Sequence, residues 1–413
     1  EAPDGNNVFD HTTFVPEGTN PDDITSISVE QLNPCAAAVC TPDETASGKD
    51  NLPDIVILTK TDEPSYTILS DPSNPGTLQP PKAIGSEEFD DRDVKFADVN
   101  LDGVPDLVIV SHDAPNRVYY GDPTRPGDYS STKHDEFGLA GDGTVAIAVA
   151  DLDRNHLTPP DIIAANENTF DQVYMGSLSP TSHHPADFTV QTIPGSDTHT
   201  TTDVAVATGI GNSKTAPNNA VWPNHVMVFT NANGPDRVLE WAFDRSADIQ
   251  AGTDPLDASD VFTLDTAVGT VNTQRVEIAD INNDNFPDIV VVHYDDATNN
   301  VAGYVYTGVY GTPITNDVFT ANKQPIGASP VKGVEMTLVD ADPSDGHGFP
   351  DSIQVLDENG GVHHFPRVGG NTWPGVFYPD PNLLEGATVA ATKPYDHQDS
   401  RGVIEVADFD GDG

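Results

Sequence analysis

The sequence is poor in basic residues and in long hydrophobic runs, and each shortage excludes a class of protein. Only 18 Lys and Arg residues stand against 66 Asp and Glu residues, which gives a formal net charge of −48. A nucleic-acid backbone or an anionic membrane surface requires a basic face, so we expect neither as a partner, whereas cations are natural partners. No apolar run reaches the roughly 18 residues of a membrane-spanning helix, so we expect no membrane span in this segment.

Cysteine is also scarce: Cys35 and Cys40 are the only two, close together in NPCAAAVCTPD. We predict a local disulfide between them, with two free thiols as the alternative. A metal pair is less favoured, because no further cysteine exists and no histidine stands nearby. The chain opens EAPDGNN, with no methionine and no signal-like segment. That start fits a processed protein that is secreted or displayed at the cell surface.

The familiar sequence motifs of catalysis are missing as well. The chain contains no Gly-X-Ser-X-Gly elbow, no His-Glu-X-X-His helix and no phosphate-binding loop, so we name no catalytic residue and do not favour an enzyme. Scattered histidines in an acidic chain are interpreted as surface groups: His112 beside Asp113, His293 before Tyr294 and Asp295, His363 with His364, and His183 with His184.

Glycine, proline and β-branched residues, by contrast, are abundant. The 34 Gly and 35 Pro residues mark many turns, and short runs such as DIVILT, DLVIVS and DIVVVHY recur between them. Long stretches with the 3.6-residue apolar period of a helix are hard to find. Short β-branched runs bounded by turn residues are typical of an all-β chain.

The chain also repeats itself. VKFADVNLDGVPDLVIV (94–110) has a close copy in VEIADINNDNFPDIVVV (276–292). Related stretches occur at 146–165, 336–356 and 403–413, with weaker ones around ISVEQL and GKDNLPDIVILT and at DVAVATGIGN. A repeated unit of irregular length near sixty residues indicates one supersecondary element with variable loops.

Each unit has the pattern strand, acidic loop, strand, turn and a further strand, followed by a longer stretch that holds a fourth. The further strands are predicted at SYTIL, RVYYG, QVYMG, HVMVF, GYVYTG and GVHHF. Four short strands per unit predict a seven-bladed β-propeller of four-stranded blades, forming one domain over residues 1–413. The blades are expected to start near residues 24, 91, 142, 200, 269, 330 and 400. The last is incomplete in this chain, so residues 1–23 are expected to help close it, with the remaining strands from a longer polypeptide or another chain.

The acidic loops carry oxygen-bearing side chains at positions 1, 3, 5 and 9. In the second unit these are Asp98, Asn100, Asp102 and Asp106. Carboxylates that converge in a tight loop repel one another unless a cation joins them, and Ca²⁺ accepts six to eight oxygen ligands in a tolerant geometry. Mg²⁺ requires a stricter octahedron. We therefore predict several calcium sites, with a solvated polar turn as the alternative reading.

The same positions supply candidate ligands in the other units, except the fourth, where Thr208 and Gly209 replace the acids and no ion is predicted. The candidates are Asp280, Asn282, Asp284 and Asp288; Asp151, Asp153, Asn155 and Asp161; Asp340, Asp342, Asp345 and Asp351; Asp408, Asp410 and Asp412; and Asp50 and Asp54, in a first unit whose leading acid is Gln31.

DVNLDGVPDLVIV and DINNDNFPDIVVV resemble the calcium loop and following strand of FG-GAP repeats, also called VCBS-type repeats. Such repeats build the β-propellers of integrin α subunits and of many secreted proteins. The resemblance implies calcium loops on one face and ligand contacts on the opposite face, where the turns at 111–116, 166–171, 293–300 and 356–361 would lie. It implies a secreted, calcium-stabilised adhesion or structural module whose partner is an extracellular protein, a glycan or a further copy in an assembly. The alternatives are a carbohydrate-binding lectin and a polysaccharide lyase or hydrolase.

Overall fold

The computed structural model describes most of the chain between residues 24 and 377. The described residues are 24–30, 32, 53–60, 63–71, 77–86, 88–122, 124–125, 127–129, 134–152, 159–176, 188–196, 200–215, 221–242, 256–265, 271–282, 286–295, 301–308, 314–320, 323–327, 331–339, 350, 352–358, 361–368 and 376–377. Within these ranges the helix and strand elements are 24 β-strands, β1 to β24.

The strands form six four-stranded antiparallel sheets. The first three sheets are β1 (Ile24–Glu30), β2 (Asp54–Thr59), β3 (Tyr66–Ile68) and β4 (Lys82–Ala83); β5 (Asp91–Ala97), β6 (Asp106–Ser111), β7 (Asn116–Tyr119) and β8 (His134–Phe137); and β9 (Thr144–Ala150), β10 (Asp161–Asn166), β11 (Gln172–Met175) and β12 (Thr189–Thr192). The next three are β13 (Thr201–Thr215), β14 (Val221–Asn231), β15 (Arg237–Trp241) and β16 (Val261–Thr263); β17 (Asn272–Ala279), β18 (Asp288–Asp295), β19 (Gly303–Tyr306) and β20 (Lys323–Ile326); and β21 (Gly333–Val339), β22 (Ser352–Asp357), β23 (Val362–Val368) and β24 (Val376–Phe377).

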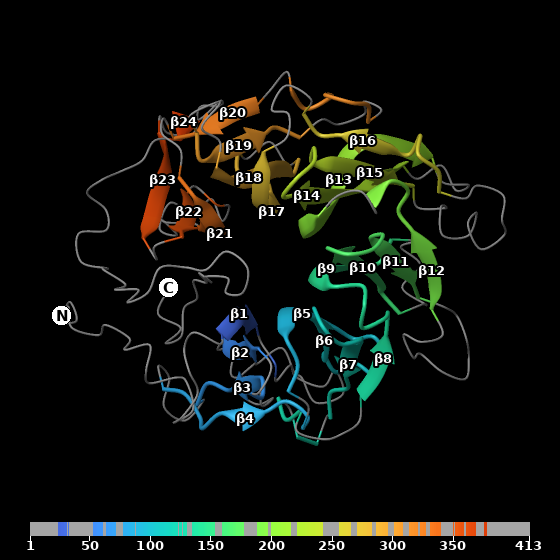
Figure 1. The fold of residues 1–413 in the computed structure, drawn as a ribbon, viewed down its shortest axis with the longest axis vertical. Helices are drawn as coiled ribbons and strands as arrows, with labels where there is room; N and C mark the ends of the chain where they lie inside the picture. Colours follow the sequence, from blue (N-terminus) through green and yellow to red (C-terminus); the bar gives the residue numbers. More distant parts are fainter. Residues whose placement is uncertain are drawn as a thin grey trace.

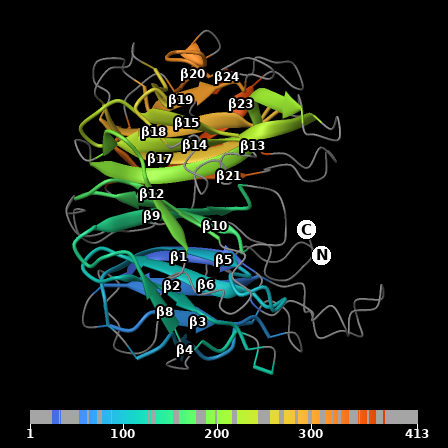
Figure 2. The same ribbon diagram turned by 90° about the vertical axis from the view of Figure 1, so that its right-hand side faces the viewer.

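The six sheets are arranged around a common axis as the blades of a β-propeller (Figure 1). Strand order within each blade follows the chain, and the first strand of each blade lines the axis. In the side view of Figure 2, β1, β5 and β17 cross the middle of the molecule, while β4 and β20 lie at its edges. The predicted all-β propeller of four-stranded blades is confirmed for these six blades. The seventh predicted unit, near residue 400, and residues 1–23 lie outside the described ranges.

The second strand of a blade explains why acidic loops lead straight into β-branched runs. All six residues of β6, DLVIVS, are buried, as are those of β2 and β10. Leu107 and Ile109 pack into the hydrophobic cluster shared with the first blade, whereas Val108 and Val110 pack into the cluster shared with the third. Both faces of the strand are therefore core, and each fully buried side chain of this kind contributes about 1.5–3 kcal/mol.

The first blade also has an apolar face directed away from the second blade. Ile55, Ile57 and Ile68 are buried there, and Ile24 and Ile27 pack against them. The other five clusters each join two successive described blades. No other described sheet contributes a residue to this isoleucine cluster.

The fourth blade departs from the sequence prediction. HVMVF lies in β14, the second strand, and the third strand is β15. The prediction of HVMVF as the later strand was wrong because the first hairpin is longer here than elsewhere. After Thr208 pairs with His225, the strands pair again from Ser213 and Pro223 to Thr215 and Val221. Where other units have an acidic loop, this unit continues the two-stranded ribbon.

Every inner strand carries a register irregularity within its first four residues. In the second blade Asp91 pairs with Ser111 and Asp93 with Val110, so one extra residue sits between them. Such a bulge twists a strand and redirects the side chain that follows. The residues that follow the irregularity are Ser26, Asp93, Ala146, Asp203, Arg275 and Glu335. All six line the propeller axis.

Candidate metal centre and blade junctions

The loop between β5 and β6 gathers three oxygen-bearing side chains in one turn. The carboxylate of Asp98 accepts the backbone N–H of Asp102 at 2.9 Å and that of Gly103 at 2.8 Å. Asn100 Oδ1 also accepts the Asp102 N–H at 2.9 Å, and Asn100 Nδ2 donates to Asp102 Oδ2 at 3.0 Å. Positive φ angles of 59° at Leu101 and 86° at Gly103 wrap the backbone tightly. The tight turn brings these polar groups together near the surface.

The donor chemistry of this turn fits a hard cation. Two carboxylates and one amide oxygen are the ligand types that Ca²⁺ prefers, and backbone carbonyls or water complete its shell in proteins. Among the described residues, no three His, Cys, Asp or Glu side chains gather closely enough to form a metal-binding group by themselves. At this turn the third donor is the amide of Asn100, between the acids Asp98 and Asp102.

Asp106, the fourth predicted ligand, has a different environment. Its side chain is fully buried: Oδ2 accepts the N–H groups of Val99 at 2.8 Å and Asn100 at 3.3 Å, and Oδ1 accepts that of Gly121 at 2.9 Å. Burial raises the pKa of Asp106 to about 7, although the bonds from Gly121 and Val99 oppose the increase. Asp106 therefore joins the loop to the end of the third strand.

The same junction recurs in three other blades. The closing aspartates Asp54, Asp161 and Asp288 are all buried. Asp54 accepts backbone N–H bonds from Leu32 and Ser70, Asp161 from Leu152 and Gly176, and Asp288 from Ile281 and Gly308, at 2.7–3.2 Å. The first blade keeps this bond pattern although its leading acid is replaced by Gln31. The closing aspartate thus has a structural role that does not depend on a complete set of metal ligands.

A glycine, which was not predicted from the sequence, faces three of the four closing aspartates. A Cβ atom on Gly121, Gly176 or Gly308 would lie 2.4, 2.1 or 2.2 Å from a backbone carbonyl oxygen. Those carbonyls belong to Pro105 and Pro287, directly before their aspartates, and to Pro159, two residues before Asp161. Only glycine permits this approach of the backbone. The sequence does mark these glycines, because RVYYG, QVYMG and GYVYTG end at Gly121, Gly176 and Gly308.

The remaining predicted ligands fall into two groups. Asp151, Asp280 and Asn282 are described, and Asn282 is buried with Nδ2 3.3 Å from Asp288 Oδ1. The other predicted ligands lie outside the described ranges, as does the predicted disulfide: Asp50, Asp153, Asn155, Asp284, Asp340, Asp342, Asp345, Asp351, Asp408, Asp410, Asp412, Cys35 and Cys40. Only the loop from Asp98 to Asp106 is described at every predicted position.

Polar residues near the turns between second and third strands also join neighbouring blades. Each of these residues forms a hydrogen bond with the inner strand of the next described blade. The partner is the first residue of β5, β9 or β13, or the second residue of β17. The contacts are Ser65 Oγ to Asp91 Oδ2 at 2.8 Å, Asn116 Nδ2 to Thr144 Oγ1 at 3.1 Å, Thr201 Oγ1 to Asp171 Oδ2 at 3.1 Å and Thr273 Oγ1 to Asp236 Oδ2 at 2.9 Å. At the junction between the fifth and sixth blades, Ala302 and Gly333 occupy the corresponding positions. Neither residue has a polar side chain, so this side-chain hydrogen bond is not formed there.

Two of these junctions contain a buried arginine. Arg237 Nη2 lies 2.5 Å from Asp171 Oδ2 of the preceding blade and 3.1 Å from Thr201 Oγ1. Arg117 pairs with Asp91 within the second blade, and Asp91 in turn accepts the hydroxyl of Ser65 from the first blade. Burial raises the pKa of Asp171, and the positive charge of Arg237 opposes that increase. These side chains connect blades inside the protein and are not presented to a ligand.

His112 and Asp113, which are adjacent in the sequence, both contact Asp90. His112 Nε2 lies 3.3 Å from Glu167 Oε2 in the next blade, and this hydrogen bond raises the pKa of His112. His112 Nδ1 lies 3.9 Å from Asp90 Oδ2, and Asp113 Oδ1 accepts the backbone N–H of Asp90 at 3.1 Å. His112 therefore joins the second blade to the third.

A comparison with protein families agrees with this geometry. Residues 98–158 match the FG-GAP-like repeat, beginning at the first ligand position of the second blade's loop. The resemblance inferred from the loops is therefore confirmed for this stretch, and the chain is a β-propeller in which residues 98–158 match an FG-GAP-like repeat. A search of curated proteins found no match. In the part of the chain that the structure describes, no helix is long and apolar enough to cross a membrane.

Proposed function

We propose that this protein is a secreted, calcium-stabilised β-propeller that serves as an adhesion or structural binding module outside the cell. The propeller with an FG-GAP-like repeat fits a binding or structural module. The observation that carries the calcium proposal is the convergence of Asp98, Asn100 and Asp102 in one turn between two strands. The strong negative charge of the chain makes cations its natural counterparts.

The proposed ion would be held mainly by side-chain oxygens of Asp98, Asn100 and Asp102. Asp106 would support the loop from beneath through its bonds to backbone N–H groups. A bound dication relieves the repulsion between neighbouring carboxylates and fixes the turn that leads into β6. Because ions bound only by the folded state stabilise it, calcium would raise the stability of the blades.

Calcium content and thermal unfolding test this proposal. The wild-type chain should bind calcium in equilibrium dialysis, and its melting temperature should fall when a chelator is added. Asp102→Asn should weaken one site, whereas Thr208→Ala, at the position in β13 that corresponds to Asp98, should leave calcium content unchanged. An unaltered melting curve in chelator, with no calcium retained, would contradict the proposal.

We also propose that a seventh blade, beginning near residue 400, covers the isoleucine face of the first blade. Ile55, Ile57 and Ile68 are buried on that face without a described sheet against them. VIEVADF, at 403–409, has the alternating apolar residues of the inner strands in the other blades. Deleting residues 400–413 should lower the melting temperature and increase the binding of a hydrophobic dye. Unchanged stability and dye binding would refute this assignment.

A protein partner is favoured over a sugar at the face of the turns between second and third strands. Asn116, Asp171 and Asp236 bond to neighbouring blades there, which leaves fewer polar groups for a hydroxyl-rich ligand. A glycan array and a panel of extracellular matrix proteins, applied to the same calcium-loaded sample, separate the two. Array binding without protein binding would favour the lectin alternative.

A further inference from the structure

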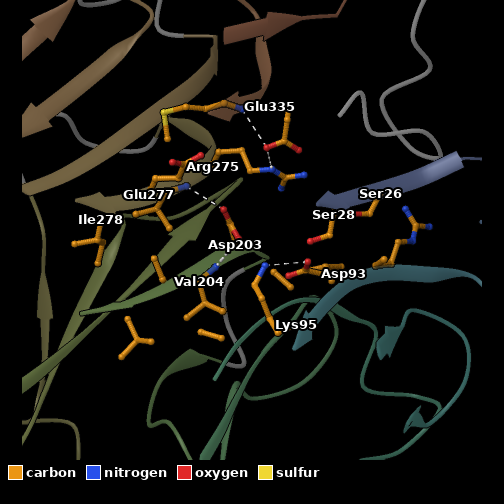
Figure 3. Close-up of a pocket in the computed structure, with 18 of the residues that line it drawn as sticks. Ser26, Ser28, Asp93, Lys95, Asp203, Val204, Arg275, Glu277, Ile278 and Glu335 are labelled. Atoms are coloured by element: carbon orange, nitrogen blue, oxygen red, sulfur yellow. Dashed lines mark hydrogen bonds and ion pairs between the residues drawn. The ribbon is translucent and has the colours of Figure 1, made fainter. Parts of the chain in front are cut away.

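A cavity of about 380 Å³ lies on the propeller axis, where the inner strands of all six described blades meet. Its wall includes the six residues that follow the strand irregularities. Ser28, Lys95 and Glu277 also line it, each two residues further along its strand. This volume falls within the range of small-molecule sites, which is roughly 300–1,000 Å³. In Figure 3 the side chains of Arg275, Asp203, Lys95 and Asp93 converge on the same space.

Two acids in this wall already have structural partners. Asp93 accepts the backbone N–H of Ile147 in the next blade at 3.0 Å and pairs with Lys95 at 3.2 Å. Asp203 likewise accepts the backbone N–H of Val276, in the blade that follows its own, at 3.0 Å. These carboxylates therefore hold neighbouring inner strands together, and they are not available as the main contacts of a ligand.

A second set of polar atoms in the cavity lacks partners among the described residues. Arg275 Nε donates to Glu335 Oε1 at 2.7 Å and Nη1 donates to Gln274 O at 3.1 Å, but no such bond uses Arg275 Nη2 or Glu335 Oε2. The hydroxyls of Ser26 and Ser28 also make no hydrogen bond within the described ranges. These groups come from β17, β21 and β1. Figure 3 shows the Arg275 guanidinium directed toward β1, with Ser28 facing it.

The opposite side of the cavity is apolar. β9 contributes Ala146 and Ala148, and β13 contributes Ala205, two residues after Asp203. Small side chains at these positions leave space beside the charged sector. The cavity therefore offers an arginine and hydroxyls as donors, a carboxylate oxygen as an acceptor, and an apolar surface within one enclosure.

Charge excludes the simpler ligands. An anion would face Asp93, Asp203 and Glu335 in a protein of net charge −48, and a bare cation would face Arg275 and Lys95. A molecule that carries both charges satisfies both. We propose that the axial cavity binds a small zwitterion with an apolar side chain, of the class of free α-amino acids. Its carboxylate bonds to Arg275 and Ser28, and its ammonium group bonds to Glu335.

Calorimetric titration of the full chain with matched probes tests this assignment. Leucine carries both charges, 4-methylpentanoate lacks the ammonium group, and 3-methylbutylamine lacks the carboxylate. Leucine should bind saturably with one site per chain, and each analogue should bind at least about tenfold more weakly, because each loses a charge-assisted contact. Absence of saturable leucine binding at millimolar concentrations, or equal binding of an analogue, would overturn the proposal.

Two variants and one control locate the site. Ser28→Ala removes a hydroxyl that no described residue uses, so the fold should be retained while leucine binding weakens by about tenfold. Glu335→Gln keeps the shape but removes the negative charge that faces the ammonium group, and should also weaken binding. Arg125 is exposed and does not line the cavity, so the Arg125→Gln variant should bind leucine normally. Full leucine affinity in both cavity variants would refute the assignment, and calcium content, measured in parallel, reports separately on the metal proposal.

Discussion

Replacing Asp171 with asparagine tests whether buried ion pairs between blades stabilise the ring. The Asp171 carboxylate is fully buried and accepts bonds from Asn166 N at 2.8 Å, Thr201 Oγ1 at 3.1 Å and Arg237 Nη2 at 2.5 Å. Asp171→Asn leaves Arg237, whose side chain is 6% exposed, without its counter-charge. Removing one partner of a buried ion pair costs about 3–5 kcal/mol, so unfolding in urea should shift by that amount.

A second substitution separates charge from packing. Arg237→Met removes the buried charge while keeping an unbranched side chain beside Phe229, whose ring centroid lies 5.5 Å from the guanidinium carbon. The double variant Asp171→Asn, Arg237→Met should therefore be more stable than the sum of the two single effects predicts. A coupling free energy of about 1–3 kcal/mol is expected for residues in one network.

The outcomes of this cycle are distinct. A loss below about 1 kcal/mol in Asp171→Asn would match an exposed ion pair and refute the structural role of the junction. Additive single effects would show that Asp171 and Arg237 stabilise the protein independently. Ser259→Ala, on an exposed turn, provides a control that should leave the urea midpoint unchanged.

Three further predictions concern single positions. Asp161→Ala should destabilise the protein by about 2–6 kcal/mol, because the N–H groups of Leu152 and Gly176 each lose their acceptor at about 1–3 kcal/mol, and Asp161→Asn should cost roughly half. Gly176→Ala should lower the free energy of unfolding by at least the cost of typical overpacking, about 1–3 kcal/mol, because its Cβ would lie 2.1 Å from Pro159 O. An unchanged urea midpoint would contradict this contact. Burial raises the pKa of Asp203 from 3.8 to about 6. The protonated form therefore stabilises the folded state fully below about pH 4, and this stabilisation is lost as the pH rises through 6. Asp203→Asn should remove that pH dependence, worth up to about 3 kcal/mol, from urea unfolding measured between pH 4 and 7.

The sequence predicted the blades because their strongest feature is local. A run such as PDLVIV combines an extended proline step, a closing aspartate and a strand buried on both faces, and this pattern survives in each well-preserved copy. The inner strands accordingly begin at Ile24, Asp91, Thr144, Thr201, Asn272 and Gly333. Local pattern was misleading in the fourth blade, where the apolar run HVMVF suits a second or a third strand equally well and the extended ribbon decides between them.

The junctions between blades could not be predicted, because they join residues far apart in the chain. Nothing near Asp93 in the sequence points to the N–H of Ile147, and nothing near Asp203 points to that of Val276. The role of Asp106 was likewise hidden, because position 9 of an acidic loop has the same chemistry whether it contacts an ion or backbone N–H groups. Its burial distinguishes these uses, and burial depends on the packed blade.

Crystallographic anomalous scattering from crystals grown in calcium is the sharpest test of the proposed calcium loop. We expect an anomalous peak in the loop from Asp98 to Asp106, about 2.3–2.6 Å from side-chain oxygens of Asp98, Asn100 and Asp102. We expect no peak beside Thr208. A well-ordered loop without a peak at millimolar calcium would contradict the calcium proposal.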